Sequence, residues 1–360
     1  MIIKSKIKGY SLEIKKSFDF FNDLTNKENA FFVIDQNVYN LFGSLFVNVP
    51  DSRLFLLDAI EENKTIEMAL KICDQLTKLD TKRNTVLVSC GGGITQDLTG
   101  FVTSIMYRGI GWIFIPTTLL AACDSCIGGK TSLNYKHFKN LLGTFYPPDR
   151  IYICPDFFDT LTEKDYKSGL GEVVKFSIMM GEDGVKLLKQ NMDLLLKRDK
   201  QVLESFVERS LSFKKTFIEE EEFDLGERVL LNFAHTFGHA FEVSSNYIIP
   251  HGTAVALGVL AANSISNARG MLNIYNQENI LNLVKKIIPF KLSKDWFKIE
   301  TIISAIRKDK KQTSENITAL LLNDDFRLTI CKDISEQEIK KAITYILSIA
   351  EVENEEVVYI

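Results

Sequence analysis

Apolar and polar positions follow two different patterns along the chain. In the first half, short apolar runs rich in branched and aromatic residues have the character of buried strands, at 30–35 (AFFVID), 85–89 (TVLVS) and 112–118 (WIFIPTT). The stretches between them, 74–80 and 97–109, have apolar residues at helical spacing. Strand, helix and strand in succession predict a parallel sheet with helical crossovers, the doubly wound α/β class.

After about Pro155 the strand pattern nearly disappears. Segments 186–223 and 251–269 are amphipathic or wholly apolar at helical period, which predicts a helical second half. We therefore expect an α/β domain with a Rossmann-like parallel sheet over residues 1–155. An all-α domain is expected to follow over residues 156–360.

Composition and charge exclude some classes of binding partner. The chain has 360 residues, 46% hydrophobic and 25% charged, which is enough for two domains with cores of their own. Its net charge of -4 gives no general attraction to nucleic acid or to anionic membranes, so small molecules are the expected partners. The segment around Gly9 and Tyr10 predicts a strand pair and not a signal peptide, and no uncharged apolar run reaches the roughly 20 residues that span a bilayer. These features predict a cytoplasmic protein.

Two of the six cysteines, Cys123 and Cys126, form a C-x-x-C motif. Such a pair is either redox-active or half of a zinc site. Because no second cysteine pair follows in the sequence, we favour two reduced thiols with no such role.

A glycine-rich loop follows the second predicted strand. Gly91, Gly92 and Gly93 lie between a strand that ends at Cys90 and a helix expected to start near Gln96. Free backbone N–H groups and a helix N-terminus in this position suit a bound anion such as a phosphate. Gln96 stands where the third glycine of G-x-G-x-x-G would be, and a tight turn that binds no ligand fits this short motif equally well.

Three of the four histidines lie close together in the sequence, at His235, His239 and His251. The first two are four residues apart, so they share one helix face and can present two imidazoles to one metal ion. Glu172 is the candidate carboxylate for such a site. A single histidine on an apolar helix is usually a buried, hydrogen-bonded residue, but the clustering in a histidine-poor chain favours a metal.

Several basic residues lie beside glycines, asparagines and apolar residues, where surface solvation explains them poorly. Scattered lysines are otherwise ordinary surface residues. The candidates are Arg108, Lys130, Lys139 with Asn140, Lys214 and Arg228.

Taken in order, these motifs resemble those of 3-dehydroquinate synthase and the related sugar-phosphate cyclases. The resemblance covers about residues 85–265 densely and includes GGG-x-x-x-D-L-x-G-F, YRG, PTTLLA, DS-x-x-GGK, KN-x-x-G-x-FY-P, SGL-x-E-V-V-K, LNF-x-HTFGHA-x-E and HG-x-AV. It implies a nucleotide-binding N-terminal domain, a helical metal-binding C-terminal domain and an active site in the cleft between them.

The resemblance also implies roles for individual residues. The metal ligands would be Glu172, His235 and His251, with His239 facing the substrate phosphate instead. NAD contacts are implied at Asp35, Asn37, Glu61, Lys64, Gly92, Gly93, Ile94, Thr95, Gln96, Asp97, Thr117, Thr118, Lys130 and Lys139. Substrate and catalytic contacts are implied at Asp124, Lys130, Asn140, Lys175, Lys214, Asp224, Arg228, Asn232 and His239. Arg108 would reach the neighbouring subunit's site in a homodimer, and Lys310 would add a phosphate contact.

The implied reaction is the cyclisation of 3-deoxy-arabino-heptulosonate 7-phosphate to 3-dehydroquinate, a step of the shikimate route to aromatic amino acids. In such enzymes NAD oxidises a ring hydroxyl held on zinc or cobalt, phosphate is eliminated, NADH returns its hydride, and ring opening precedes an internal aldol closure. Lys214 and Arg228 form a cationic pair suited to the carboxylate of that substrate.

Four departures from the family pattern bear on the substrate. Gln96 replaces a glycine, Asp224 stands where the family prefers glutamate, Thr253 replaces the acid of HG-x-AV, and the segment 316–326 lacks an expected glycine. We hypothesise that Gln96 either displaces its helix slightly or contacts the pyrophosphate.

These departures leave other readings open. One is a cyclase that acts on a different sugar phosphate, for a secondary metabolite or a surface glycan. Another is an NAD- and metal-dependent alcohol dehydrogenase of the glycerol-dehydrogenase type, which would accumulate NADH and would not need the basic cluster. A non-catalytic binding protein would show neither bound metal nor turnover.

Overall fold

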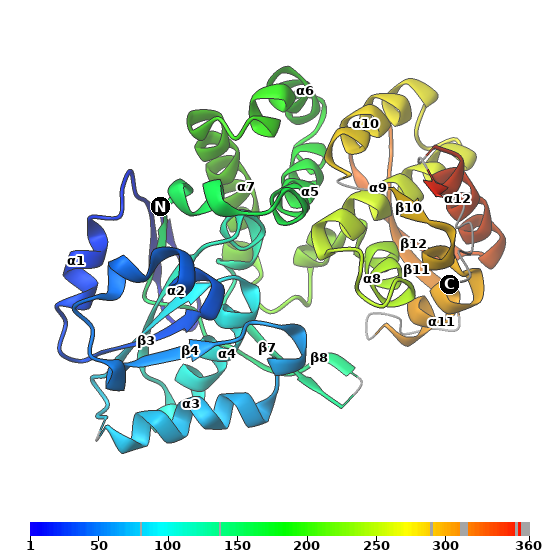
Figure 1. Cartoon of the computed structure of the whole chain (residues 1–360). Coiled ribbons are helices and arrows are strands. Elements are labelled where there is room, and N and C mark those ends of the chain that lie inside the picture. The colour runs from blue at the N-terminus through cyan, green and yellow to red at the C-terminus, as the bar shows by residue number, and fades with distance from the viewer. Residues whose placement is uncertain (80, 137, 289–290, 310–315, 350–351, 354–360) are drawn as a thin grey trace, which may run out of the picture. The chain divides into compact units, whose positions relative to one another are not determined.

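The computed structural model describes residues 1–79, 81–136, 138–288, 291–309, 316–349 and 352–353 (Figure 1). The chain divides into two compact units, of which unit 1 comprises Met1–Leu161 with Val207–Asp224 and unit 2 comprises Thr162–Phe206 with Leu225–Ile360. The sequence pattern places a boundary at 155/156 and assigns 207–224 to the helical half, whereas the contacts of this segment group it with unit 1.

A seven-stranded sheet in the order β1-β2-β9-β6-β5-β3-β4 forms the centre of unit 1. The strands are β1 (Ile2–Ile3), β2 (Tyr10–Ile14), β3 (Ala30–Asp35), β4 (Leu54–Leu57), β5 (Val86–Gly91), β6 (Gly111–Pro116) and β9 (Arg150–Ile153). β1 pairs antiparallel with β2, as the pattern around Gly9 predicts, and all other neighbours in this sheet are parallel. The doubly wound α/β prediction is thus confirmed.

The parallel strands are apolar on both faces because helices cover both faces of such sheets. In β3, for example, Phe32, Val33 and Ile34 are all fully buried. The helical segments of unit 1 are α1 (Phe20–Thr25), α2 (Gln36–Phe42), η1 (Gly43–Phe46), η2 (Asp51–Arg53), η3 (Glu61–Asn63), α3 (Ile66–Lys78), α4 (Gly93–Ile105), η4 (Met106–Arg108), η5 (Ala121–Ser125) and η6 (Pro155–Thr160).

Two features of unit 1 lie outside its main sheet. The strands β7 (Lys130–Tyr135) and β8 (Phe138–Phe145) form an antiparallel hairpin, and β7 packs beside α4. The segment η5 is a single π-helical turn in which Cys126 N donates to Ala121 O at 3.0 Å. This turn and the hairpin carry several of the candidate site residues.

Unit 2 is mainly helical, as the sequence predicts. Its helices are α5 (Glu163–Met179), α6 (Glu182–Leu196), η7 (Glu227–Asn232), α8 (His235–Ser244), α9 (His251–Ala268), α10 (Ile274–Ile287), η8 (Lys294–Phe297), α11 (Ile299–Lys308) and α12 (Glu336–Ile349). A further helix, α7 (Lys200–Glu220), begins in unit 2 and continues into unit 1. Thr162 caps the N-terminus of α5, because its side chain accepts a hydrogen bond from Asp165 N.

The prediction that the second half is purely α-helical needs one correction. Strands β11 (Ile317–Leu322) and β12 (Leu328–Ile334) form an antiparallel hairpin, and β10 (Leu292–Ser293) pairs with β13 (Val352–Glu353). The run ITALLL of β11 is almost entirely buried and packs on α9. A short apolar run of this kind does not distinguish strand from helix by period, which is why the sequence pattern missed it.

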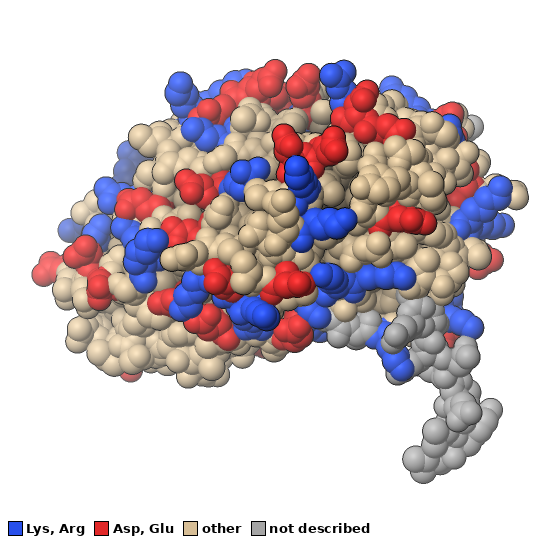
Figure 2. Space-filling view, turned by 90° about the horizontal axis from the view of Figure 1, so that it is seen from above, with Lys and Arg blue, Asp and Glu red and all other residues tan. Residues whose placement is uncertain are grey.

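Charged side chains of both signs occur on the surface. On the face shown in Figure 2, basic and acidic side chains are interspersed, so they cancel one another over short distances. No helix within the described part of the chain is long and apolar enough to cross a membrane.

Candidate functional site

The strand order of unit 1 creates a binding position at one point of the sheet. β4 lies on one side of β3 in the sheet, and β5, β6 and β9 follow in that order on the other side. The direction of winding therefore reverses between β3 and β5, and ligands of doubly wound proteins bind at such a switch point, outside the carboxyl ends of the strands. β3 ends at Asp35 and β5 ends at Gly91, so the glycine loop and Asp35 flank this point.

The glycine loop forms the first turn of a helix. Gly92 is the N-cap of α4 and its carbonyl accepts from Gln96 N at 3.0 Å, so the helix begins at Gly93 and not near Gln96. A side chain on Gly92 would press on the Thr118 side chain. Backbone N–H groups at the start of a helix suit a phosphate, which supports the anion-site interpretation of the loop.

A buried ion pair connects α4 to the loop before α3. Lys64 Nζ lies 2.6 Å from Asp97 Oδ2, and both side chains are largely buried. Ser132 N donates to Asp97 Oδ1 at 3.0 Å, and Ser132 Oγ lies 2.9 Å from Asp97 Oδ2. Burial raises the pKa of the Asp97 carboxyl, while Lys64 and Ser132 counteract that rise by favouring the carboxylate.

The same network holds Asn140, a candidate substrate residue. Lys64 Nζ donates to Asn140 Oδ1 at 2.7 Å, and Ser132 Oγ lies 2.8 Å from the same oxygen. Asn140 N donates to Asn134 Oδ1 at 3.0 Å. The structure thus brings a predicted cofactor residue and a predicted substrate residue into direct contact, and it adds Ser132 and Asn134, which the sequence patterns did not indicate.

Glu61 and Lys139 lie at the edge of this network. Lys139 Nζ is 3.3 Å from Glu61 Oε1, and Asn134 Nδ2 donates to the same oxygen at 2.8 Å. Asp35 accepts a hydrogen bond from Asn37 N at 2.8 Å at the start of α2, and burial raises the pKa of its carboxyl. Asp35 ends a strand of the parallel sheet and Asn37 and Glu61 follow strands of it, whereas Lys139 lies on β8 of the hairpin.

Two further ion pairs in unit 1 involve predicted substrate residues. Lys214 Nζ, on α7, donates to Asp124 Oδ1 at 2.8 Å and to Asp124 O at 2.6 Å. Lys130 Nζ lies 2.7 Å from Asp224 Oδ2. Asp224 therefore reaches a lysine although it is one methylene shorter than glutamate.

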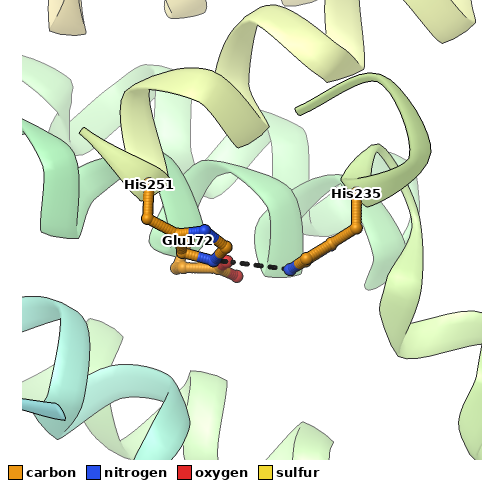
Figure 3. Close-up of side chains that lie close together, drawn as sticks. All are labelled: Glu172, His235 and His251. Carbon is orange, nitrogen blue, oxygen red and sulfur yellow. Dashed lines mark ion pairs between the residues drawn. The ribbon is translucent and has the colours of Figure 1, made fainter. Parts of the chain in front are cut away.

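Three predicted metal ligands converge in unit 2 (Figure 3). His235 Nε2 and His251 Nε2 each lie 3.5 Å from the same oxygen of Glu172, Oε1. That oxygen is fully buried and accepts no hydrogen bond from the described residues. Ligand atoms about 3.4 Å apart are what a tetrahedral ion with bonds of about 2.1 Å requires, so the three side chains fit a divalent metal.

Glycines bring the helices of these ligands into backbone contact. A Cβ on Gly171, next to Glu172, would overlap the carbonyl oxygen of Gly252, next to His251. Gly252 N donates to Ser168 Oγ at 3.1 Å, which ties the start of α9 to α5. Gly258 of α9 makes a similarly close approach to Ala234, immediately before His235. The three ligands can meet because no side chain separates α5, α8 and α9 at these points.

Each histidine ligand is oriented through its other ring nitrogen. His235 Nδ1 lies 3.0 Å from the carbonyl oxygen of Phe233, which can only accept, so Nδ1 carries the proton and Nε2 is left as the electron-pair donor. His251 Nδ1 lies 3.0 Å from Glu242 Oε2. Burial alone lowers the pKa of His251, but Glu242 and Glu172 together raise it to about 10. Glu242 follows His235 by two turns of α8, a spacing that could have indicated it in the sequence.

His239 shares the helix face of His235 but does not join Glu172. Its Nδ1 lies 3.2 Å from Asp309 Oδ2. It could also form a second set of potential ligands, with Glu242 and His251. Lys175, one turn after Glu172, lies 2.5 Å from Glu172 Oε2 and donates to Leu231 O at 3.2 Å.

The remaining predicted site residues are placed as follows. Arg108 is exposed at the end of η4 and has a φ of 64°. Thr117 and Thr118 directly follow β6. Arg228 is buried in η7, and Asn232 is the last residue of η7. Lys310 lies outside the described residues.

Neither Cys123 nor Cys126 forms a disulfide within the described chain, and both side chains are buried. Burial raises the pKa of the Cys126 thiol to about 12. A thiol that is so hard to ionise is a poor nucleophile and a poor metal ligand, which agrees with the interpretation as reduced, inert cysteines.

Comparisons with known proteins identify relatives of the whole chain. A family model described as 3-dehydroquinate synthase N-terminal matches residues 54–168, and one described as 3-dehydroquinate synthase C-terminal matches residues 169–312. A 3-dehydroquinate synthase of Dictyoglomus turgidum is 38% identical over 298 residues, which cover 82% of this chain and 83% of the relative.

Two solved structures share the fold. The 2-epi-5-epi-valiolone synthase of Streptomyces hygroscopicus, with NAD+ and Zn2+ bound, has a TM-score of 0.83 at 22% identity, covering 94% of this chain and 97% of its own. A 2-deoxy-scyllo-inosose synthase in complex with carbaglucose-6-phosphate, NAD+ and Co2+ has a TM-score of 0.82 at 22% identity, covering 95% and 98%. At this level of identity the likeness concerns the fold alone.

Proposed function

Because the chain belongs to the 3-dehydroquinate synthase family, we propose that it converts 3-deoxy-arabino-heptulosonate 7-phosphate to 3-dehydroquinate with release of phosphate. By reaction class it would be a carbon–oxygen lyase. The observation that carries this proposal is the buried oxygen of Glu172, which faces two imidazole Nε2 atoms and accepts no hydrogen bond within the described chain.

NAD and a divalent metal ion, zinc or cobalt, are the cofactors of the proposed reaction. Glu172, His235 and His251 would hold the metal, and the loop from Gly92 to Asp97 would hold the NAD pyrophosphate at the switch point of unit 1. When bound, NAD supplies reversible hydride transfer at a ring hydroxyl and the metal supplies Lewis acidity at that hydroxyl. The neighbours whose structures contain NAD+ with Zn2+ or Co2+ support this assignment.

The residues of the chain would bind and orient the substrate. An ammonium has three N–H donors, and Lys214 gives two to Asp124, so the third can donate to an anionic group of the substrate. The Oδ1 of Asn140 is occupied by Lys64, which fixes the orientation of the Asn140 amide. Lysine and amide donors that are held in this way stabilise the phosphate as its charge develops on leaving.

One experiment tests the proposal directly. The purified protein is incubated with NAD, Zn2+ or Co2+ and 3-deoxy-arabino-heptulosonate 7-phosphate, and phosphate release and product mass are measured together. We expect phosphate and 3-dehydroquinate in equal amounts with no net NADH. Accumulation of NADH without phosphate would indicate a dehydrogenase instead.

A cyclase with a different sugar phosphate is the second candidate. It is favoured by Asp224 in place of glutamate and by the two fold neighbours, which are named for other cyclic products. Sedoheptulose 7-phosphate and glucose 6-phosphate are suitable comparison substrates. Phosphate release from one of these, with none from the heptulosonate, would select this candidate.

The proposed enzyme is a homodimer in which Arg108 reaches the partner's site. The exposed position of Arg108 and its left-handed backbone, which directs the side chain away from a regular helix, support this assignment. Light scattering should give twice the chain mass, and Arg108→Ala should raise KM without changing NAD affinity. A monomeric active enzyme would contradict the dimer.

A further inference from the structure

The side chain of Gln96 joins the first turn of α4 to the π-helical turn η5. Gln96 Nε2 donates to Ser125 O at 2.7 Å, and Ser125 Oγ donates to Gln96 Oε1 at 2.7 Å. Both ends of the amide are therefore bound by one residue that lies 29 positions later in the chain. Gln96 is only 4% exposed, so the amide has no ready alternative in solvent.

Gln96 stands where a glycine would complete the G-x-G-x-x-G spacing, and its pairing with Ser125 gives the side-chain amide a role at this position. The amide is directed at Ser125, and the anion-binding groups of the loop are backbone N–H groups that need no side chain. The hypothesis that Gln96 contacts the pyrophosphate is therefore not the one that the geometry favours. A glycine at this position could not reach Ser125 at all.

Ser125 directly follows Asp124, whose carbonyl and carboxylate oxygens both accept from Lys214 Nζ. Two consecutive residues of η5 thus bind different helices, Asp124 binding α7 and Ser125 binding α4. η5 is a single π turn, in which Cys126 N donates to Ala121 O. The side-chain contacts from α4 and α7 add to this backbone hydrogen bond and help to fix the conformation of Asp124.

We propose that Gln96 is a positioning residue for substrate binding, which acts by holding η5 so that Asp124 and Lys214 keep their mutual geometry. This inference rests on the proposed function, in which Asp124 and Lys214 contact the substrate. It assigns two separate roles to the first turn of α4. The backbone at the start of the helix serves the cofactor, and the Gln96 side chain serves the substrate.

The test uses Gln96→Met, which keeps the length of the side chain but removes both hydrogen bonds. Because only substrate positioning is lost, we expect KM for 3-deoxy-arabino-heptulosonate 7-phosphate to rise about tenfold, the size of effect expected for two hydrogen bonds to a partly buried group. NAD affinity, measured by titration of protein fluorescence, should stay within about twofold of wild type. In a Lys214→Met background, the same substitution should add little to the rise in KM, because Gln96 acts through the pair.

Gln75→Met is the matched control. Gln75 Nε2 donates to Leu54 O at 2.7 Å in the same unit, so this variant also loses a hydrogen bond from a glutamine to a backbone carbonyl. We expect Gln75→Met to lower thermal stability and leave the KM for substrate unchanged. If Gln96→Met behaves in the same way, or if it weakens NAD binding and spares KM, the proposal is overturned.

The proposal can also be separated from the assigned reaction. If wild-type protein releases no phosphate from the heptulosonate, the proposed function fails, and hydrogen exchange then tests the role of Gln96. Exchange at the Cys126 amide should be faster in Gln96→Met by about tenfold than in wild type, with no such change in Gln75→Met. Equal exchange in all three proteins would refute the role of Gln96 in holding η5.

Discussion

Two buried carboxylates, Asp97 in unit 1 and Glu172 in unit 2, have opposite surroundings. Asp97 receives two contacts from Ser132 and an ion pair from Lys64 at 2.6 Å. Glu172 Oε1 accepts no hydrogen bond in the described chain and faces the Nε2 atoms of two histidines at 3.5 Å. The sequence analysis predicted an NAD contact at Asp97 and a metal ligand at Glu172, and the surroundings of the two carboxylates differ accordingly.

The difference shows how to distinguish a carboxylate that holds neighbouring side chains in place from one that binds a metal ion. A carboxylate surrounded by N–H and O–H donors is already satisfied, so Asp97 serves to hold Lys64 and, through it, Asn140. Glu172 Oε1 instead faces two imidazole Nε2 atoms, which are electron-pair donors when the rings are neutral, so this oxygen suits a bound cation, while Lys175 contacts the other oxygen, Oε2. The two sites should therefore respond separately to substitution.

The largest effect is expected from Glu172→Gln. The amide removes the negative charge that the metal requires, so bound zinc should be lost and phosphate release should fall at least about a thousandfold. NAD affinity should be unchanged, which metal analysis and fluorescence titration measure on the same sample. Glu163→Gln, an exposed position on the same helix, is the control and should retain its metal. A zinc-loaded, active Glu172→Gln protein would remove the basis of the proposed metal site.

A smaller effect on the same site is expected from Glu242→Gln. Glu242 accepts from His251 Nδ1 and thereby directs Nε2 toward Glu172, so the variant should bind zinc about 10- to 100-fold more weakly. Competition with a chromophoric chelator measures this affinity without any assay of turnover. Unchanged zinc affinity would mean that His251 is oriented by packing alone.

Asp97→Asn tests the other half of the comparison. Lys64 would lose its charged partner inside the protein, so the network that holds Asn140 should loosen and NAD affinity should fall about tenfold. Zinc content should remain that of wild type. Loss of zinc together with NAD would show that the two sites do not respond separately and would contradict the comparison.

The smallest effect is expected at an ion pair of Arg269, which lies at the opposite end of α9 from the metal ligand His251. Arg269 holds the pKa of Glu338 down to about 2, below its ordinary value of 4.5. A depressed folded-state pKa contributes stability above the ordinary value, and that contribution is lost as the pH falls toward 2. Glu338→Gln should therefore lower Tm by about 2 °C at pH 7, and by progressively less below pH 4.5. Calorimetry at several pH values measures this, and a constant difference would contradict it.

Much of the fold was predictable from local pattern. The strand over 30–35 is found with the same bounds, because five consecutive apolar residues followed by Asp35 suit a central parallel strand. The helix at 251–269 is equally clear. The hairpin of β11 and β12 was missed because its apolar run is too short to show a period, and the burial that decides it comes from α9.

Some site residues could likewise be selected from the sequence, and others could not. His235, His251 and Glu172 could be selected by residue type and family motif, and the structure brings all three together. Ser132 lies in none of the quoted motifs, and the motifs that contain Ser125 and Glu242 do not tell which partner each residue has. For Gln96 the sequence left two hypotheses, displacement of its helix or contact with the pyrophosphate, whereas the structure shows its amide paired with Ser125.

The sequence by itself determined the class of fold, the glycine loop and the set of metal-binding residue types, since these depend on local periodicity and on side-chain chemistry. Only the tertiary structure decided which groups satisfy one another. Hydrogen bonds and ion pairs act over about 3 Å, and the chain must fold before residues such as Gln96 and Ser125, 29 positions apart, can come within that distance.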